Sequence, residues 1–222
     1  MHNINKYSPE ELMERYNKIL NIITTTFEGE RQERLLHLYS DKEMGELLVT
    51  APASGTAWFH YCYVGGYMDH IINICSRILA VAALYKKMGG HIDFTKEEAI
   101  FAALNHDLGK LGQDRDTPYY IPSKDSWRIE KRQEYFEHNN TLSRLSVPDR
   151  SLFVLQNYGV TCNLKETLAI KNHDGMYNEN NKMFFIANLP EHKAQTNLPY
   201  ILHWADHMSS QAEYDEWKYD EK

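Results

Sequence analysis

The chain has 222 residues, of which 42% are hydrophobic and 25% are charged, a composition typical of a soluble globular protein. Lysine and arginine number 24 against 31 aspartate and glutamate residues, which gives a formal net charge of −7. A chain with a net negative charge lacks the positive field that binding to long nucleic acid requires, so we expect local groups to hold any anionic substrate. The polar N-terminus predicts no signal peptide, and no uninterrupted apolar run approaches the roughly 18 residues of a membrane span, so no membrane partner is expected.

The cysteines and histidines narrow the class of protein further. Cys62, Cys75 and Cys162 form no closely spaced pair and no disulfide framework, which favours a reducing, cytoplasmic location. Eleven histidines are many for a chain of this length, and their positions decide whether they gather at one site. For each single histidine, a hydrogen-bonded core position is the simpler alternative to metal binding.

The first fifty residues are predicted to be helical. A helix begins at Ser8-Pro9-Glu10-Glu11, where the proline and the acidic residues suit a first turn. Apolar residues then recur at helical spacing as far as Ile23, and a second amphipathic stretch covers 30–48. The small residues of 51–57 predict a loop, which separates this N-terminal helical appendage (residues 1–50) from the rest.

The middle of the chain carries two strong helix signals. Apolar residues mark a buried helix over 66–88, which two glycines end. Thr95-Lys-Glu-Glu98 forms a capping box that opens a helix towards His106. Prolines and polar residues over 112–127 predict an irregular loop, and the pattern over 130–145 predicts a further helix.

The last third is predicted to contain three helices and one strand. The helices cover 151–158, 164–171 and 198–212, and the apolar run over 182–188 is the strand candidate, as half of a small hairpin. A charged, frayed tail over 213–222 would follow.

These elements predict an all-α fold, a helical bundle with at most a minor β-hairpin. We expect the main domain to occupy residues 51–212.

Three of the predicted helices carry metal-ligand side chains on their inner faces. His70 lies one turn into its helix, His106-Asp107 ends another, and Asp206 follows the apolar stripe of the last. An inward carboxylate is costly unless it is paired or binds a metal, and such groups from several helices are what a metal site in a bundle core requires. The mixture of imidazole and carboxylate ligands suits divalent Mn, Fe, Co, Ni or Zn.

A wider set of motifs resembles the HD-domain superfamily of metal-dependent phosphohydrolases. His106-Asp107 lies within Asn105-His-Asp-Leu-Gly-Lys110, a frequent form of the superfamily's doublet. The segment from His60 to His70 resembles one in the HD domains of bacterial 3′→5′ exoribonucleases. Over roughly residues 56–210, three more motifs fall in the order of that subgroup: Glu137-His138, Asn172-His173-Asp-Gly175 and Leu202-His-Trp-Ala-Asp206.

The resemblance implies an HD-domain helical bundle with one or two divalent metal ions, Mg among the candidates. Asn172 stands where the subgroup often has a histidine, so a single ion is the alternative to two. A bound ion would activate water for attack on a phosphate. Six residues would be ligands, the first four for one ion and the last two, sharing Asp107, for a second: His70, His106, Asp107, Asp206, His138 and His173.

The same resemblance suggests where a phosphate would bind. Asp107 and Lys110 are the expected catalytic residues, with the Lys110 ammonium on a phosphate oxygen. The further candidates for substrate binding are His60, the backbone amides of Gly65 and Gly66, Arg115 and Arg132. Simpler alternatives exist for most of them: a solvated lysine at the end of a helix for Lys110, a tight turn for the two glycines, and a mixed-charge surface for the arginines.

We therefore expect a metal-dependent phosphohydrolase that acts on a nucleotide or another phosphorylated small molecule, of the nucleotidase or dNTP hydrolase type. One alternative is an HD-type 3′→5′ exonuclease or a phosphodiesterase for cyclic or short oligonucleotides. A second is an HD domain that binds a nucleotide or a partner protein without turnover. A homo-oligomer is compatible with all three.

Overall fold

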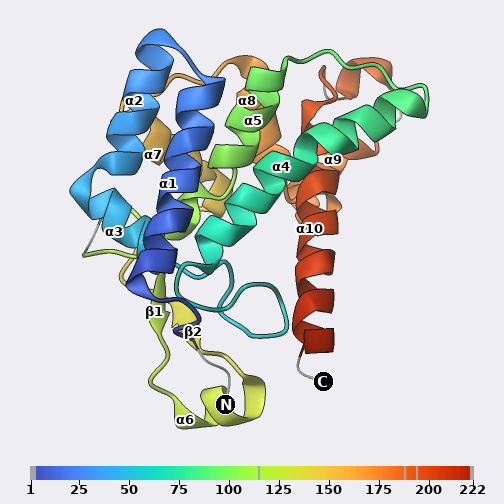
Figure 1. Ribbon diagram of the computed structural model, residues 1–222. Helices are drawn as coiled ribbons and strands as arrows, with labels where there is room; N and C mark the ends of the chain where they lie inside the picture. The colour runs from blue at the N-terminus through green and yellow to red at the C-terminus, as the bar shows by residue number, and fades with distance from the viewer. Residues whose placement is uncertain (1–3, 115, 188, 194, 221–222) are drawn as a thin grey trace.

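Helices form nearly all of the regular structure in the computed structural model, which describes residues 4–114, 116–187, 189–193 and 195–220 (Figure 1). Over these residues, ten α-helices accompany one two-stranded antiparallel hairpin, which confirms the all-α prediction with a minor hairpin. The α-helices are α1 (Pro9–Thr26), α2 (Gly29–Ser40), α3 (Lys42–Thr50), α4 (Gly66–Lys87), α5 (Lys96–Asn105), α6 (Ser126–Arg132), α7 (Val147–Asn157), α8 (Leu164–Asn172), α9 (Lys182–Phe185) and α10 (Leu198–Asp220).

The N-terminal helices follow local signals in the sequence. α1 begins at the predicted capping box, in which the Ser8 hydroxyl accepts from the Glu11 amide and the Glu11 carboxylate accepts from the Ser8 amide. The single helix expected over 30–48 is two helices, because the Asp41 side chain accepts from the amides of Glu43 and Met44 and so begins α3. The buried side chains of α1–α3 belong to the same apolar cluster as those of α4, α5, α8 and α10.

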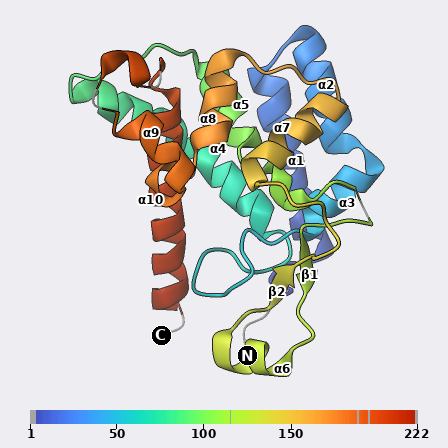
Figure 2. The same ribbon diagram turned by 180° about the vertical axis from the view of Figure 1, so that it is seen from behind.

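The helix α4 lies at the centre of the fold and packs against α10, α5, α1 and α3 (Figures 1 and 2). Its inner face carries Met68, Ile71, Ile74 and Ile78, all fully buried. By length and composition alone α4 is apolar enough to cross a membrane, a test that the core helix of a soluble protein also passes. Its packing among four other helices accounts for that apolar composition.

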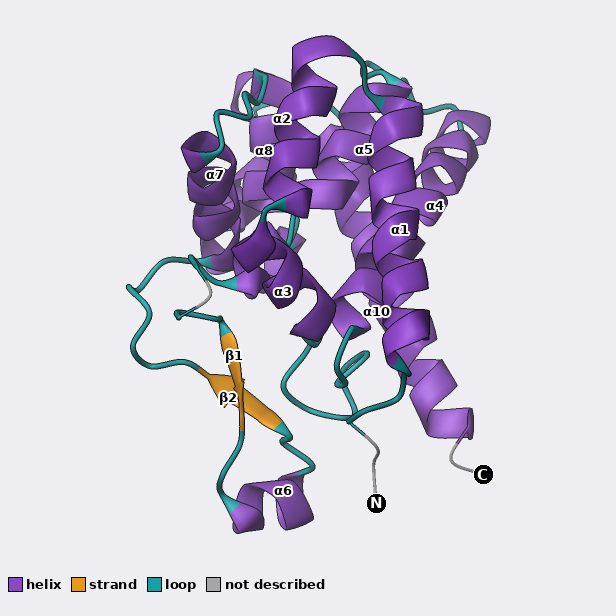
Figure 3. Ribbon diagram, turned by 60° about the vertical axis from the view of Figure 1, so that its left-hand side comes forward, coloured by secondary structure: helices purple, strands orange, loops and turns teal. Residues whose placement is uncertain are grey.

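The hairpin lies where the sequence suggested a loop and a helix. β1 (Tyr120–Pro122) pairs antiparallel with β2 (Phe136–His138), and α6 lies between them. The helix expected over 130–145 is wrong, because Gln133 adopts a left-handed conformation that ends α6 and an aromatic run follows it. Figure 3 shows the hairpin and α6 at one end of the helical bundle.

Two expectations near the C-terminus are also wrong. Residues 182–185 form the short helix α9 instead of a strand, with the Phe185 ring against Tyr200 of α10; Asn188 of that predicted strand lies outside the described residues. The last helix does not fray after residue 212 but continues to Asp220. Glu213, which the sequence placed in a charged tail, is 1% exposed.

Candidate metal centre

Four predicted ligands from three helices meet in the interior of the bundle. His70 comes from α4, His106 and Asp107 follow the last turn of α5, and Asp206 comes from α10. The Nε2 atom of His70 lies 3.2 Å from Asp206 Oδ1 and 3.7 Å from Asp107 Oδ2. The Nε2 atom of His106 lies 3.5 Å from Asp107 Oδ2 and 3.9 Å from Asp206 Oδ1. Four ligand atoms thus face one another across a small gap.

His173, at the end of α8, extends this cluster. Its Nε2 atom lies 3.5 Å from Asp107 Oδ1, the carboxylate oxygen that faces away from His70. His106, Asp107 and His173 therefore form a second group with ligand atoms within 4.8 Å of one another. Asp107 thus faces His70 and His106 with Oδ2 and His173 with Oδ1.

The ends of α5 and α8 fix the rings of His106 and His173 in the same way. Each Nδ1 atom lies 2.8 Å from a helix carbonyl three residues earlier, Ala103 and Ile170 respectively. A ring nitrogen can only donate to a carbonyl oxygen, so Nδ1 carries a proton, and in the neutral ring the lone pair is on Nε2, directed at the cluster. Carbonyls of the last turn lack partners within the helix, which is why a histidine just after a helix end adopts this arrangement.

Asn172 does not remove a ligand from the cluster. Its amide nitrogen donates to the Leu168 carbonyl at 2.8 Å, just as Asn105 donates to the Phe101 carbonyl at 2.8 Å. The two Asn-His-Asp segments therefore end α5 and α8 alike, with the asparagine turned back onto its helix and the histidine turned inward.

His70 is oriented by a residue that the sequence analysis missed. Its Nδ1 atom lies 3.0 Å from Glu213 Oε2, and Asn73 Nδ2 donates to the other oxygen of Glu213 at 3.3 Å. With Nδ1 facing this carboxylate, Nε2 faces the cluster. Glu213 follows Asp206 by two helical turns, so the heptad spacing on one face of α10 is the signal that could have found it.

Burial and neighbouring charges shift the pKa of the three histidines His70, His106 and His173. Burial lowers the pKa of His106 to about 4, so this ring is neutral. Burial opposes a charge on His70 as well, but Glu213 and Asp206 outweigh it and raise its pKa to about 10. Asp107 and Asp174 likewise overcome burial and raise the pKa of His173 to about 9. A metal that binds here therefore displaces protons from His70 and His173.

The carboxylates are ionised. Burial favours the neutral form of Asp107, but Lys110, whose Nζ atom lies 2.7 Å from Asp107 Oδ2, and His106 hold the pKa of that carboxyl well below its usual value. Burial also favours the neutral form of Asp206, but the nearby rings of His70 and His106 outweigh it and lower the pKa of this carboxyl.

These side chains fit a divalent metal. The Nε2 atoms of His70 and His106 are buried and have no hydrogen-bond partner among the described residues, although buried polar atoms are normally paired. Two atoms bound to one metal at about 2.0–2.2 Å lie about 3–3.5 Å apart, close to the shorter distances of the cluster. Neutral imidazoles, carboxylates and ordered Nδ1 partners are the usual components of such a site.

The remaining predicted ligand lies apart from the cluster. His138, on β2, is exposed and stacks on the Tyr120 ring with centroids 5.2 Å apart, and it belongs to none of the potential metal-binding groups in the described part of the chain. His60 does lie beside the cluster, its ring 4.9 Å from that of His70.

The predicted phosphate-binding groups differ in their surroundings. The Gly66 amide donates to the Tyr63 carbonyl, and a Cβ on Gly65 would lie 2.5 Å from Leu12, contacts of a tightly packed turn. Arg132 lies at the end of α6, 3.5 Å from a Glu134 oxygen. Arg115 lies outside the described residues. Of these candidates, Lys110 alone forms an ion pair with a predicted ligand in the described part of the chain.

Replacing Glu213 with glutamine is expected to weaken metal binding about 10- to 100-fold, the usual cost of altering a group that orients a metal-ligating histidine. The substitution removes the carboxylate charge that stabilises a positive charge on the His70 ring, while a hydrogen-bond acceptor of the same shape remains. Glu216→Gln is the matched control, since Glu216 lies on the same helix and accepts from Tyr61 rather than from His70. Metal dissociation constants from competition with a chromogenic chelator provide the measurement; equal values for both variants would contradict the role given to Glu213.

Comparison with known proteins finds no matching protein family, no similar curated protein and no similar solved structure. The chain is a mostly helical protein with buried histidine and aspartate clusters that could bind a metal ion.

Proposed function

We propose that this protein is a metal-dependent phosphohydrolase of the HD type, which hydrolyses a phosphate ester or anhydride of a nucleotide or a similar small compound. One observation carries the proposal: a lysine ammonium lies 2.7 Å from a carboxylate that itself faces three inward histidines. Metal ligands alone fit many roles, but a fixed cation beside them suits a substrate with anionic oxygens.

His70, His106, Asp107 and Asp206 would hold a divalent ion. Such an ion supplies Lewis acidity towards a phosphoryl oxygen and lowers the pKa of water. His173 and the second oxygen of Asp107 support a place for another ion, which would share this carboxylate. His138 belongs to none of the potential metal-binding groups among the described residues, so it is not proposed as a ligand.

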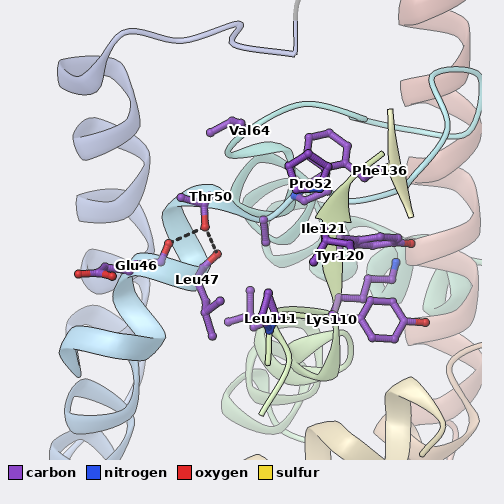
Figure 4. Close-up of a pocket in the computed structure, with 14 residues that line it drawn as sticks. Glu46, Leu47, Thr50, Pro52, Val64, Lys110, Leu111, Tyr120, Ile121 and Phe136 are labelled. Atoms are coloured by element: carbon purple, nitrogen blue, oxygen red, sulfur yellow. Dashed lines mark hydrogen bonds between the residues drawn. The ribbon is translucent and has the colours of Figure 1, made fainter. Parts of the chain in front are cut away.

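Lys110 would bind a phosphate oxygen of the substrate. The electrostatic effect of Asp107 outweighs burial and raises the pKa of Lys110, so the ammonium keeps its charge at neutral pH. Figure 4 shows Lys110 and Tyr120 with their polar ends on the same side, pointing away from Leu47. Solvent reaches this region, since the side chains of Asp206 and Lys110 are 20% and 17% exposed.

The cavity of about 430 Å³ drawn in Figure 4 is a separate feature. Lys110 borders it, but its other walls are mainly apolar, and none of the four ligands of the first ion lines it. We therefore place the reaction on the side to which the Lys110 ammonium points.

Adding a divalent metal to protein stripped with a chelator is expected to raise its melting temperature and to start hydrolysis. A ligand at 100 times its dissociation constant stabilises the folded state by about 2.7 kcal/mol, provided that it does not bind the unfolded chain. Mn²⁺, Co²⁺, Ni²⁺, Zn²⁺ and Mg²⁺ would be compared in thermal melts and in phosphate release from a panel of nucleotides. Metal binding without turnover on any substrate would favour the binding-only alternative, and no thermal shift with any ion would contradict the metal site.

A further inference from the structure

A hollow of about 200 Å³, smaller than the cavity of Figure 4, lies between the hairpin and the loop that precedes α4. We call it the hairpin hollow. Its lining includes Thr56 and Phe59 of the loop, Tyr120 of β1, Glu134, and His138 of β2. Pockets for drug-sized ligands measure roughly 300–1,000 Å³, so the hairpin hollow suits one flat ring system rather than a larger compound.

The hairpin hollow combines aromatic rings with polar side chains. Phe59 is 58% exposed, and the exposed His138 ring stacks on Tyr120 with centroids 5.2 Å apart and planes 25° apart. Thr56 and Glu134 add a hydroxyl and a carboxylate to the same lining. A nucleobase has matching properties, since its faces stack on aromatic rings and its edges carry hydrogen-bonding groups.

The loop on one side of the hairpin hollow leads directly to the metal centre. Phe59 is followed by His60, whose ring lies 4.9 Å from the ring of the predicted ligand His70. The other end of the loop is fixed to the hairpin, because the Gly55 carbonyl accepts from the Phe136 amide at 3.1 Å. A Cβ on Gly55 would lie 2.6 Å from the Phe136 carbonyl oxygen, so only glycine allows this contact. The loop therefore holds the hairpin hollow close to the metal centre.

The strand on the other side leads to Lys110. Tyr120 lines the hairpin hollow and also lines, together with Lys110, the cavity of Figure 4, where the polar ends of both side chains lie on the same side. The residue before it, Tyr119, donates its amide to the Leu111 carbonyl at 3.4 Å, which ties β1 to the turn that carries Lys110. Tyr120 and His138 are paired across the two strands, so both side chains lie on one face of the hairpin.

We propose that the hairpin hollow binds the base of a nucleotide whose phosphate lies at Lys110 and the metal centre, so that the substrates are nucleotides rather than simple sugar phosphates. The inference rests on the proposed function. In a nucleotide the sugar separates the base from the phosphate, and Tyr120 separates the hairpin hollow from Lys110 in the same way. Stacking on aromatic rings accepts any base, so the rings alone do not select one.

The test compares Phe59→Ala and His138→Ala with His91→Ala, which changes an exposed histidine in the loop between α4 and α5. The main probe is the phosphonate analogue of AMP, in which a CH₂ group replaces the ester oxygen, so that metal-loaded protein cannot hydrolyse it. The same analogue of ribose 5-phosphate lacks the base, and adenosine lacks the phosphate. Titration calorimetry would measure the binding of all three compounds, and thermal melts would verify folding.

We expect Phe59→Ala and His138→Ala each to weaken binding of the AMP analogue at least about fivefold, the lower end of the effect of removing a ring from a base stack, and to leave the ribose analogue within about twofold. His91→Ala should bind both analogues like the wild type. Because Phe59 and His138 are exposed, their substitution should leave the melting temperature close to that of the wild type.

Two results would overturn the role of the hairpin hollow: a wild type that binds the AMP analogue no better than the ribose analogue, or equal affinity for the AMP analogue in all three variants. Failure of the proposed function has a different signature. The wild type would then hydrolyse no phosphorylated compound with any metal, while adenosine, whose binding needs neither phosphate nor metal, would still bind more weakly to Phe59→Ala and His138→Ala than to His91→Ala.

Discussion

An Asp107→Asn protein is expected to lose metal binding by at least about 100-fold and to lose hydrolysis altogether. The Asp107 carboxylate faces three histidines, with Oδ2 towards His70 and His106 and Oδ1 towards His173. Removing its charge leaves Lys110 and the raised-pKa histidines as neighbouring positive groups, which repel a divalent ion. Altering a group that only orients a ligand already costs 10- to 100-fold, so loss of a ligand costs at least as much.

Elemental analysis of the purified protein and chelator competition would measure this loss. Asp174→Asn is the control, because Asp174 lies 3.5 Å from the same His173 ring but its side chain is 43% exposed. His106→Ala is expected to behave like Asp107→Asn. Wild-type metal content in both Asp107→Asn and His106→Ala would mean that the metal site is misassigned.

Local signals explain which parts of the fold could be predicted from the sequence. The capping boxes at Ser8 and Thr95 and the apolar periodicity of α4 are complete within one segment, and the structure has helices there. The hairpin could not be found in this way, because β1 and β2 are three residues each and α6 separates them. Each strand takes its conformation from a partner that is distant in the sequence.

The residues of the candidate site also differ in whether local signals or distant contacts place them. His106 and His173 follow helix ends, and their turn inward depends on carbonyls three residues away, a local arrangement that a motif captures. Glu213 and Phe59 depend on contacts between elements far apart in the chain. A charged C-terminal segment gives no local sign that one of its glutamates becomes buried beside α4. The sequence around Phe59 likewise gives no sign that its ring will line a hollow together with His138.

Lys110→Met is expected to keep the metal and lose at least about 100-fold in kcat/KM. An ammonium has no lone pair for a cation, so Lys110 cannot be a metal ligand while it is protonated. Its Nζ atom bonds to Asp107 Oδ2, and the loss of that bond frees the oxygen for metal, so metal affinity should be equal or higher. Methionine keeps most of the stem and removes the charge, and removing one donor from a charge-stabilising site costs about 10²–10³-fold in rate.

The same substitution has a second signature, in stability. Without metal, Asp107 loses the cation that balances its buried charge, so stripped Lys110→Met should melt at a lower temperature than the stripped wild type. Added metal should remove most of this difference, because the ion then balances the carboxylate. Lys171→Met, which removes an exposed lysine that pairs with Asp149, is the control and should change neither kcat/KM nor the response to metal. If Lys110→Met instead turned over at nearly the wild-type rate with normal metal content, Lys110 would be only a lysine at the end of a helix. The phosphate would then have to be held by other groups.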